Sequence, residues 1–169
     1  PRETILECLE LAVQAPTGGN KQSWRWIVVD DTAKKAEIGA LYKGIADAYA
    51  IQQGGAELAQ QDAQVARILD SFAWLAENLH RVPAMVIPCI EGRPAPDWTP
   101  SRVAAHWGSI FPAVWSFQLA LRARGLGSAL TTLHLNEEAV VARLLGIPDG
   151  MMQVALLPVA YTKGTDFKR

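Results

Sequence analysis

The chain contains 169 residues, of which 50% are hydrophobic and 20% are charged. This composition excludes an intrinsically disordered or collagen-like chain, and the length favours one domain with its own core. The net charge of −1, without a run of five Lys or Arg residues, argues against a nucleic-acid-binding surface.

The N-terminal part is predicted to contain two helices around one strand. Apolar residues recur at helical spacing over residues 4–15, and a loop with consecutive glycines follows at 16–20. Residues 24–29 are aromatic and β-branched, which predicts a strand. We expect a short helix over 33–42, and the Ala-, Gly- and Gln-rich residues 43–64 predict a mobile helical flap that covers the substrate.

A further helix and strand follow. Apolar residues at helical spacing predict a helix over 65–79, which Pro83 ends. Residues 84–89 predict a strand, and Pro88 is expected at a sheet edge or a strand end because it lacks a backbone donor. Residues 91–102 carry three prolines and predict a loop.

The most hydrophobic segment, residues 103–121, contains no Asp, Glu, Lys or Arg. It is close to membrane-spanning length, but it includes polar residues and a proline, and no second segment resembles it. We therefore predict a helix over 104–124 that is buried all round in a protein core or a subunit interface, with Pro112 either near its start or kinking it. No signal peptide is visible, so we expect a soluble, cytoplasmic protein without a membrane partner.

The C-terminal third is predicted to form two strands around one helix. Residues 128–133 indicate a strand, and Asn136 is predicted to cap a helix that ends at Gly146. Residues 153–161 predict a last buried strand. The residues that this helix is predicted to bury are Val140, Val141, Leu144 and Leu145. Since no repeat or linker divides the chain, residues 1–169 are expected to form a single layered domain.

Ordinary catalytic constellations do not stand out. His80, His106 and His134 are scattered, so each is interpreted as a surface or packing residue and no metal site is predicted. Motifs of serine hydrolases, Rossmann folds and P-loops are missing from the sequence. Cys8 and Cys89 lack CxxC spacing and predict free thiols in a reducing compartment.

Two segments carry groups suited to a flat heteroaromatic ligand. In the first, residues 16–24, glycines let the backbone approach a ring, and the amides of Asn20 and Gln22 both donate and accept hydrogen bonds. The alternative for this segment is a helix stop with turn-forming residues. The second segment, Gly-Leu-Gly-Ser-Ala-Leu-Thr-Thr-Leu at 125–133, has the alternative of an ordinary buried strand.

Together these segments resemble the FMN-dependent nitroreductase family. Its members carry a Pro-Ser/Thr-x-x-Asn-x-Gln-Pro-Trp loop after the first helix, which residues 16–24 match except that Ser23 replaces the proline. They also carry an Ala-x-Gly-Leu-Gly-like turn and a later Leu-Gly-Ile-Pro, matched here at 123–127 and 145–148. The resemblance spans residues 2–161.

The resemblance implies an α+β sandwich with a mostly antiparallel central sheet flanked by helices. It further implies a homodimer with shared active sites, the long helix lying at the dimer core. FMN would be the cofactor and NADH or NADPH the donor, with two-electron (hydride) ping-pong transfer to a small nitroaromatic or quinone-type acceptor. Two alternatives remain open: a flavin-fragmenting or dehalogenating relative on the same fold, and a non-enzymatic flavin-binding or sequestering protein.

The resemblance also implies the residues that contact FMN, with no catalytic side chain because flavin N5 carries the chemistry. Backbone N–H groups around Thr131 would face N5 and O4, and Asn20 and Gln22 would bond the pyrimidine edge or the ribityl chain. The family's phosphate-binding arginines would precede Pro1, with Lys168 and Arg169 assisting. The full implied set is Pro16, Thr17, Gly18, Asn20, Gln22, Ser109, Ile110, Leu130, Thr131, Thr132, Lys168 and Arg169.

Overall fold

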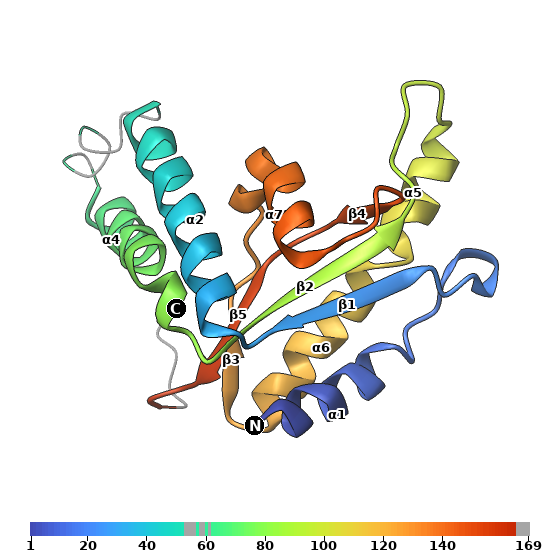
Figure 1. Cartoon of the computed structure of the whole chain (residues 1–169), viewed down its shortest axis with the longest axis horizontal. Helices are drawn as coiled ribbons and strands as arrows, with labels where there is room; N and C mark the ends of the chain where they lie inside the picture. The colour runs from blue at the N-terminus through green and yellow to red at the C-terminus, as the bar shows by residue number, and fades with distance from the viewer. Residues whose placement is uncertain (53–56, 58–59, 61, 165–169) are drawn as a thin grey trace.

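The computed structural model describes residues 1–52, 57, 60 and 62–164. At its centre lies a sheet with the strand order β1-β2-β5-β3, and β4 also pairs with β2 (Figure 1). Every pair between these strands is antiparallel. The strands are β1 (Trp24–Val29), β2 (Ala84–Glu91), β3 (Leu126–Ser128), β4 (Met151–Gln153) and β5 (Leu157–Tyr161). The predicted α+β class and antiparallel sheet are confirmed.

Helices cover both faces of the sheet (Figure 1). One layer consists of α1 (Arg2–Ala12), α5 (Pro100–Gly108) and α6 (Phe111–Ala123). The other layer consists of α2 (Thr32–Gln52), α4 (Ala63–Asn78) and α7 (Glu138–Leu145). Three 3-10 turns connect these elements: η1 (Gly18–Asn20), η2 (Leu79–Arg81) and η3 (Leu133–Glu137).

Strand β2 is buried on both faces, and its side chains divide the core into two clusters. Val86 and Ile90 point to the cluster that contains α1 and α6, whereas Met85 and Ile87 point to the cluster that contains α2 and α7. This alternation follows from the two-residue period of a strand. Because β2 is central, the prediction that Pro88 marks an edge or strand end is wrong. Its carbonyl accepts from Val154 N, at the interruption between β4 and β5 where the ladder is irregular.

The helix predicted over 104–124 is two helices, α5 and α6, separated at Ser109 and Ile110. Pro112 lies in the first turn of α6, where a missing N–H costs nothing, whereas a continuous helix would lose a hydrogen bond there. The helix α5 also begins at Pro100, inside the predicted loop. Among the described residues, no helix combines the length and the hydropathy needed to cross a bilayer.

Helix α2 is longer than predicted, because residues 43–52 continue it instead of beginning a separate flap. Tyr42 and Ala46 are buried, which ties this second half of α2 to the core. The rest of the predicted flap lies in part outside the described residues. Within α2, Gly39 permits close approach to η2, since a Cβ at Gly39 would lie 2.8 Å from His80 Cβ.

Three predictions for the C-terminal third are wrong in detail. The predicted strand over 128–133 is the shorter β3 followed by a single bridge from Thr131 to Leu156. Asn136 lies inside η3 and donates to Leu133 O, so it does not cap α7. The predicted strand over 153–161 is split into β4 and β5, while the predicted helix stop at Gly146 is confirmed by its left-handed φ of 68°.

Candidate functional site

The loop from Thr17 to Gln22 is fixed to the start of α6 by one serine. Gly18 N donates to Ser109 Oγ at 2.8 Å, and Ser109 Oγ donates to Ala105 O at 2.6 Å. Within the loop, Gln22 N donates to Thr17 Oγ1 at 3.1 Å. The structure therefore brings Thr17, Gly18 and Ser109 of the predicted set together, with Pro16 exposed beside them.

This loop stores backbone strain. Asn20 and Gln22 have φ values of 53° and 50°, and they are the only non-glycine residues with positive φ in the described part of the chain. Such conformations cost about 1–2 kcal/mol each for residues with a Cβ, and they concentrate at functional sites. The two side chains are exposed and meet through a 2.8 Å hydrogen bond from Gln22 Nε2 to Asn20 Oδ1. Asn20 Nδ2 and Gln22 Oε1 remain available for a ligand.

A cleft of about 470 Å³ opens between this loop and α5. We call it the Trp98 cleft, and its side-chain walls are formed by Lys21, Glu91, Trp98, Arg102 and His106 around a floor at Gly18 and Ser109. The Arg102 guanidinium stacks 4.1 Å from the centroid of the Trp98 ring, and the His106 ring meets Trp98 edge-on at 5.2 Å. The cleft therefore combines aromatic surface with positive charge.

His106 lines this cleft and has one unsatisfied ring nitrogen. Its Nε2 is buried without a hydrogen-bond partner among the described residues, although buried polar atoms are nearly always paired. Desolvation by burial lowers the pKa of His106 below its ordinary value, so the ring is neutral at pH 7. A neutral imidazole still offers one donor and one acceptor.

The second predicted group lies next to α2. Thr131 Oγ1 and the Tyr42 hydroxyl are 2.7 Å apart, and Thr131 N and O pair with Leu156 at 3.1 and 2.7 Å. Burial raises the pKa of Tyr42, so its hydroxyl stays protonated. Leu130 and Thr132 are exposed on either side of Thr131.

One protomer does not bring the two predicted groups together. Ile110, next to Ser109, is fully buried in the α1–α6 cluster, whereas Tyr42, beside Thr131, belongs to the α2–α7 cluster. The loop group and the Thr131 group are therefore anchored to opposite faces of the sheet. Lys168 and Arg169 lie outside the described residues.

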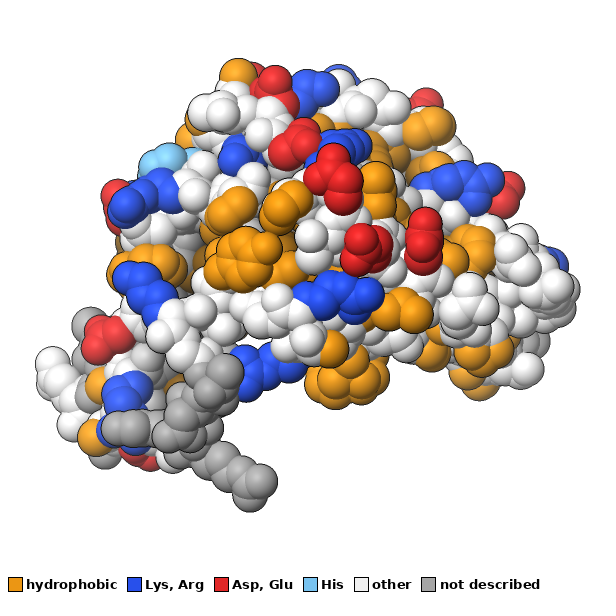
Figure 2. All heavy atoms as spheres, turned by 90° about the horizontal axis from the view of Figure 1, so that it is seen from below, with side chains coloured by type: hydrophobic (Ala, Val, Ile, Leu, Met, Phe, Trp, Pro, Cys, Tyr) orange, Lys and Arg blue, Asp and Glu red, His pale blue; other side chains and the backbone are white. Residues whose placement is uncertain are grey.

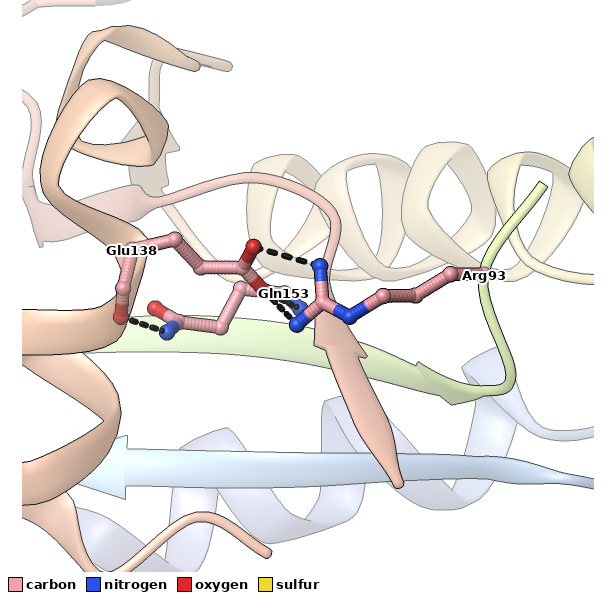
Figure 3. Close-up of polar contacts among 3 residues, drawn as sticks. All are labelled: Arg93, Glu138 and Gln153. Atoms are coloured by element: carbon pink, nitrogen blue, oxygen red, sulfur yellow. Dashed lines mark hydrogen bonds and ion pairs between the residues drawn. The ribbon is translucent and has the colours of Figure 1, made fainter. Parts of the chain in front are cut away.

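A polar network on the α2–α7 side joins the loop after β2 to α7 and β4 (Figure 3). Arg93, in the loop after β2, binds Glu138 of α7 through two hydrogen bonds of 2.7 and 2.9 Å. Glu138 Oε1 also accepts from Gln153 N at 2.8 Å, and Gln153 Nε2 donates to Glu138 O at 2.9 Å. Burial raises the pKa of Glu138, but the Arg93 and Gln153 hydrogen bonds outweigh it and hold that pKa below its usual value.

His134 lies near this network, and neither of its ring nitrogens has a hydrogen-bond partner among the described residues. Its side chain is 0% exposed, and desolvation lowers its pKa to about 4 in spite of the nearby Glu138 carboxylate. Both cysteines are free and buried, which confirms the prediction of free thiols. Burial raises the pKa of Cys89 to about 12, so its thiol is not nucleophilic near neutral pH.

Helix α6 presents an apolar stripe away from the core. Phe111, Trp115 and Leu119, spaced four residues apart, are 38%, 61% and 50% exposed. Figure 2 shows the underside of the view in Figure 1, where α1 and α6 lie, and hydrophobic side chains form patches there between charged ones. A single protomer therefore buries only part of this helix, and the predicted subunit interface along the rest of it stays a prediction.

Sequence reasoning missed the aromatic and charged wall of the cleft. Trp98 lay in a segment interpreted only as a loop, and His106 was interpreted as a surface or packing residue. The available signal was a tryptophan directly before a Thr-Pro helix start, with Arg102 in the first turn of the helix that follows. The pairing of Arg93 with Glu138, 45 residues apart, had no local signal.

Comparisons with known proteins agree on one family. A sequence model of the nitroreductase family matches residues 1–161. An iodotyrosine deiodinase of Thermotoga neapolitana is 28% identical over 163 residues, which are 95% of this chain and 77% of that protein. A crystal structure of oxidized iodotyrosine deiodinase bound to FMN and 3-iodo-L-tyrosine has a TM-score of 0.75 at 23% identity, covering 100% of this chain and 83% of that one. An FMN- and NADPH-dependent nitroreductase from Sphigopyxis sp. strain HMH has a TM-score of 0.65 at 18% identity, covering 96% and 80%.

Proposed function

Because the chain belongs to the nitroreductase family, we propose that it is an FMN-dependent oxidoreductase that uses NADH or NADPH to reduce a small nitroaromatic or quinone-type acceptor. For a nitro compound the balanced reaction is NAD(P)H + H⁺ + ArNO₂ → NAD(P)⁺ + ArNO + H₂O. One N–O bond breaks, the nicotinamide is oxidised and the nitro nitrogen is reduced by two electrons.

The strained loop carries this proposal. Its two positive-φ side chains, Asn20 and Gln22, are the residues that the sequence resemblance assigned to the flavin. Strain of this kind persists only where the surrounding structure enforces it, and here Ser109 and Thr17 hold the loop. A merely structural turn would be expected to place Gly, rather than Gln, at such a position.

The residues present fit the ring end of FMN. Gly18 and Gly19 carry no side chains, so a ring can approach the loop backbone where they line the cleft. The free amide atoms of Asn20 and Gln22 supply one donor and one acceptor for a pyrimidine edge. On the other group, the exposed Thr132 follows Thr131, whose backbone is already paired with Leu156. Thr131 would therefore position its neighbours.

When bound, FMN would accept a hydride and pass two electrons on, which needs no acid or base from the chain. The chain's residues bind, orient and exclude water. Asn20 and Gln22 would fix the orientation of the ring, and Tyr42 would hold the Thr131 hydroxyl in place. Since the two groups lie on opposite faces of one protomer, we propose that a homodimer with shared sites brings them together.

Flavin identification followed by reduction tests this function. Denaturation of the purified protein should release FMN and not FAD, as seen by chromatography. Anaerobic addition of NADH or NADPH should bleach the flavin absorbance, and a nitroarene should restore it. A protein that binds no flavin, or that stays yellow with both nucleotides and is reduced only by dithionite, would contradict the proposal; the second result would favour a flavin-sequestering role.

A reductive dehalogenase is the second candidate, favoured by the deiodinase relative at 28% identity. Its balanced reaction on an iodoarene is RI + NAD(P)H → RH + I⁻ + NAD(P)⁺. Parallel assays with 3-iodotyrosine and a nitroarene, with iodide release measured directly, separate the two activities. Iodide release at a rate well above nitroarene reduction would select the dehalogenase.

A further inference from the structure

The Trp98 cleft carries an excess of positive charge that the proposed reaction does not use. Lys21 and Arg102 contribute two positive charges, and Glu91 contributes one negative charge. Among the described residues, neither Lys21 nor Arg102 forms an ion pair with a carboxylate, whereas Arg2, Arg93 and Arg124 each do. The cleft therefore has a formal charge of +1 with two unpaired cations facing it.

The geometry of Arg102 suits a planar anion. The Arg102 guanidinium carbon lies over the Trp98 ring, 4.1 Å from its centroid, which is a cation–π contact. The planar guanidinium fork carries N–H donors, two of which match the two oxygens of a carboxylate. The contact with Trp98 restrains the side chain, so less rotamer entropy is lost when an anion binds.

Two further features suit an aromatic ligand. The rings of Trp98 and His106 form part of the cleft lining. Ala105 adds apolar surface between the polar groups, whereas Ile90 is only 2% exposed. A volume of about 470 Å³ falls in the range of sites for small organic ligands.

We propose that the Trp98 cleft binds an aromatic carboxylate as the electron acceptor, with the carboxylate on Arg102 and Lys21 and the ring against the apolar surface. This inference rests on the proposed function and narrows it from neutral nitroaromatics and quinones to acceptors that carry an acidic group. The Gly18–Ser109 junction forms the floor, which places such an acceptor beside the strained loop.

A matched pair of acceptors tests the inference in the full-length, FMN-loaded protein. 4-Nitrobenzoate and its methyl ester share the same nitroarene and differ in the charge. The expected result is a kcat/KM at least tenfold higher for the acid. Arg102→Gln should lower the ratio of the kcat/KM for the acid to the kcat/KM for the ester about tenfold, the range of a hydrogen bond to a charged group. Arg102→Lys should recover only part of it, because Lys lacks the planar fork.

Binding of benzoate, which carries no reducible group, provides a readout independent of turnover. Titration followed by tryptophan fluorescence should show saturable binding that Arg102→Gln weakens about tenfold and Glu91→Gln strengthens two- to threefold. Arg143→Gln, which removes an exposed arginine of α7, is the matched control and should leave the affinity for benzoate unchanged.

The possible outcomes show whether the cleft binds the carboxylate of an acceptor or the phosphate of FMN. If Arg102→Gln lowers the affinity for FMN and spares benzoate, the cleft binds the cofactor phosphate and the inference is overturned. Equal kcat/KM for acid and ester also overturns it, while leaving the proposed function in place. If neither acceptor is turned over but benzoate still binds through Arg102, the proposed function fails and the anion site stands.

Discussion

The two sides of the sheet differ in how their charged groups are paired. On the α2–α7 side, Glu138 accepts hydrogen bonds from Arg93 and from Gln153 N within one protomer, while Gln153 Oε1 and both ring nitrogens of His134 are buried without a partner among the described residues. On the α1–α6 side, the cations of the Trp98 cleft have no carboxylate partner among the described residues. Exposed apolar side chains occur on both sides, with Trp115 of α6 61% and Trp74 of α4 66% exposed. We interpret the Glu138 hydrogen bonds as a source of stability and the unpaired cations as suited to a ligand, and we propose that a second subunit covers the stripe on α6.

The largest expected effect is a loss of stability when the Glu138 hydrogen bonds on the α2–α7 side are removed. Glu138→Ala should lower the free energy of unfolding by about 3 kcal/mol, because it leaves Arg93 and the buried Gln153 N–H without their acceptor. Urea unfolding followed by circular dichroism measures this loss. As a control, Asp30→Ala removes a half-exposed partner of Arg2 and should cost less than about 0.5 kcal/mol. Equal losses for the two variants would contradict the comparison.

Acid should weaken the same side through His134. The pKa of His134 is about 4 in the folded chain and near 6.5 in the unfolded chain. As the pH falls from 7 to 5, the unfolded chain therefore binds a proton at His134 and the folded chain does not. The stability that a neutral His134 contributes is present above pH 6.5 and falls by about 2 kcal/mol between pH 7 and pH 5. Unfolding at both pH values should show that His134→Leu lacks this loss, whereas His80→Gln, which changes an exposed histidine, retains it. An unchanged pH dependence in His134→Leu would show that His134 is not the responsible group.

The smallest expected effect is a loss of FMN affinity when the loop on the α1–α6 side is changed. Asn20→Gly should weaken FMN binding by about 1–2 kcal/mol, the scale of a lost polar contact. Glycine is the sharper substitution, because it accepts a φ of 53° and removes the amide without adding strain. Isothermal titration with FMN measures the affinity, and thermal unfolding of the flavin-free protein should be unchanged or slightly improved. Asn78→Ala, which changes a half-buried asparagine at the end of α4, serves as the control for FMN affinity. A loss of apo stability equal to the loss in affinity in Asn20→Gly would identify Asn20 as a turn residue only.

Local patterns predicted the elements whose boundaries are set locally. The strand at 24–29 and the helix stop at Gly146 are confirmed, because alternation, β-branching and a left-handed glycine act over a few residues. The continuous helix over 104–124 failed because uniform hydropathy masked the break before Pro112. The central position of Pro88 depends on the distant gap between β4 and β5, which no local pattern reveals.

The site was predictable to the same extent. The loop at 16–22 stood out in the sequence through its glycines and amides. Its hydrogen bond to Ser109, however, joins residues 91 positions apart, which no local pattern predicts. The Trp98–Arg102 stack is local, yet its meaning comes from the cleft that the loop and α5 form together. Sequence reasoning therefore proposed the loop amides as ligand contacts, which stays a prediction, and missed the charge of the cleft beside them.

The central claim is that a second subunit covers the α6 stripe and completes the flavin site. Sedimentation velocity of Trp115→Glu, recorded at 280 and 450 nm, tests this claim most directly. Trp115 is 61% exposed, so a glutamate there leaves the protomer core intact while placing charge in the apolar stripe of α6. The wild-type protein should sediment as a dimer that carries the flavin absorbance, and the variant should sediment as a folded monomer that has lost FMN. A stable monomer with full FMN affinity and turnover would contradict the shared site.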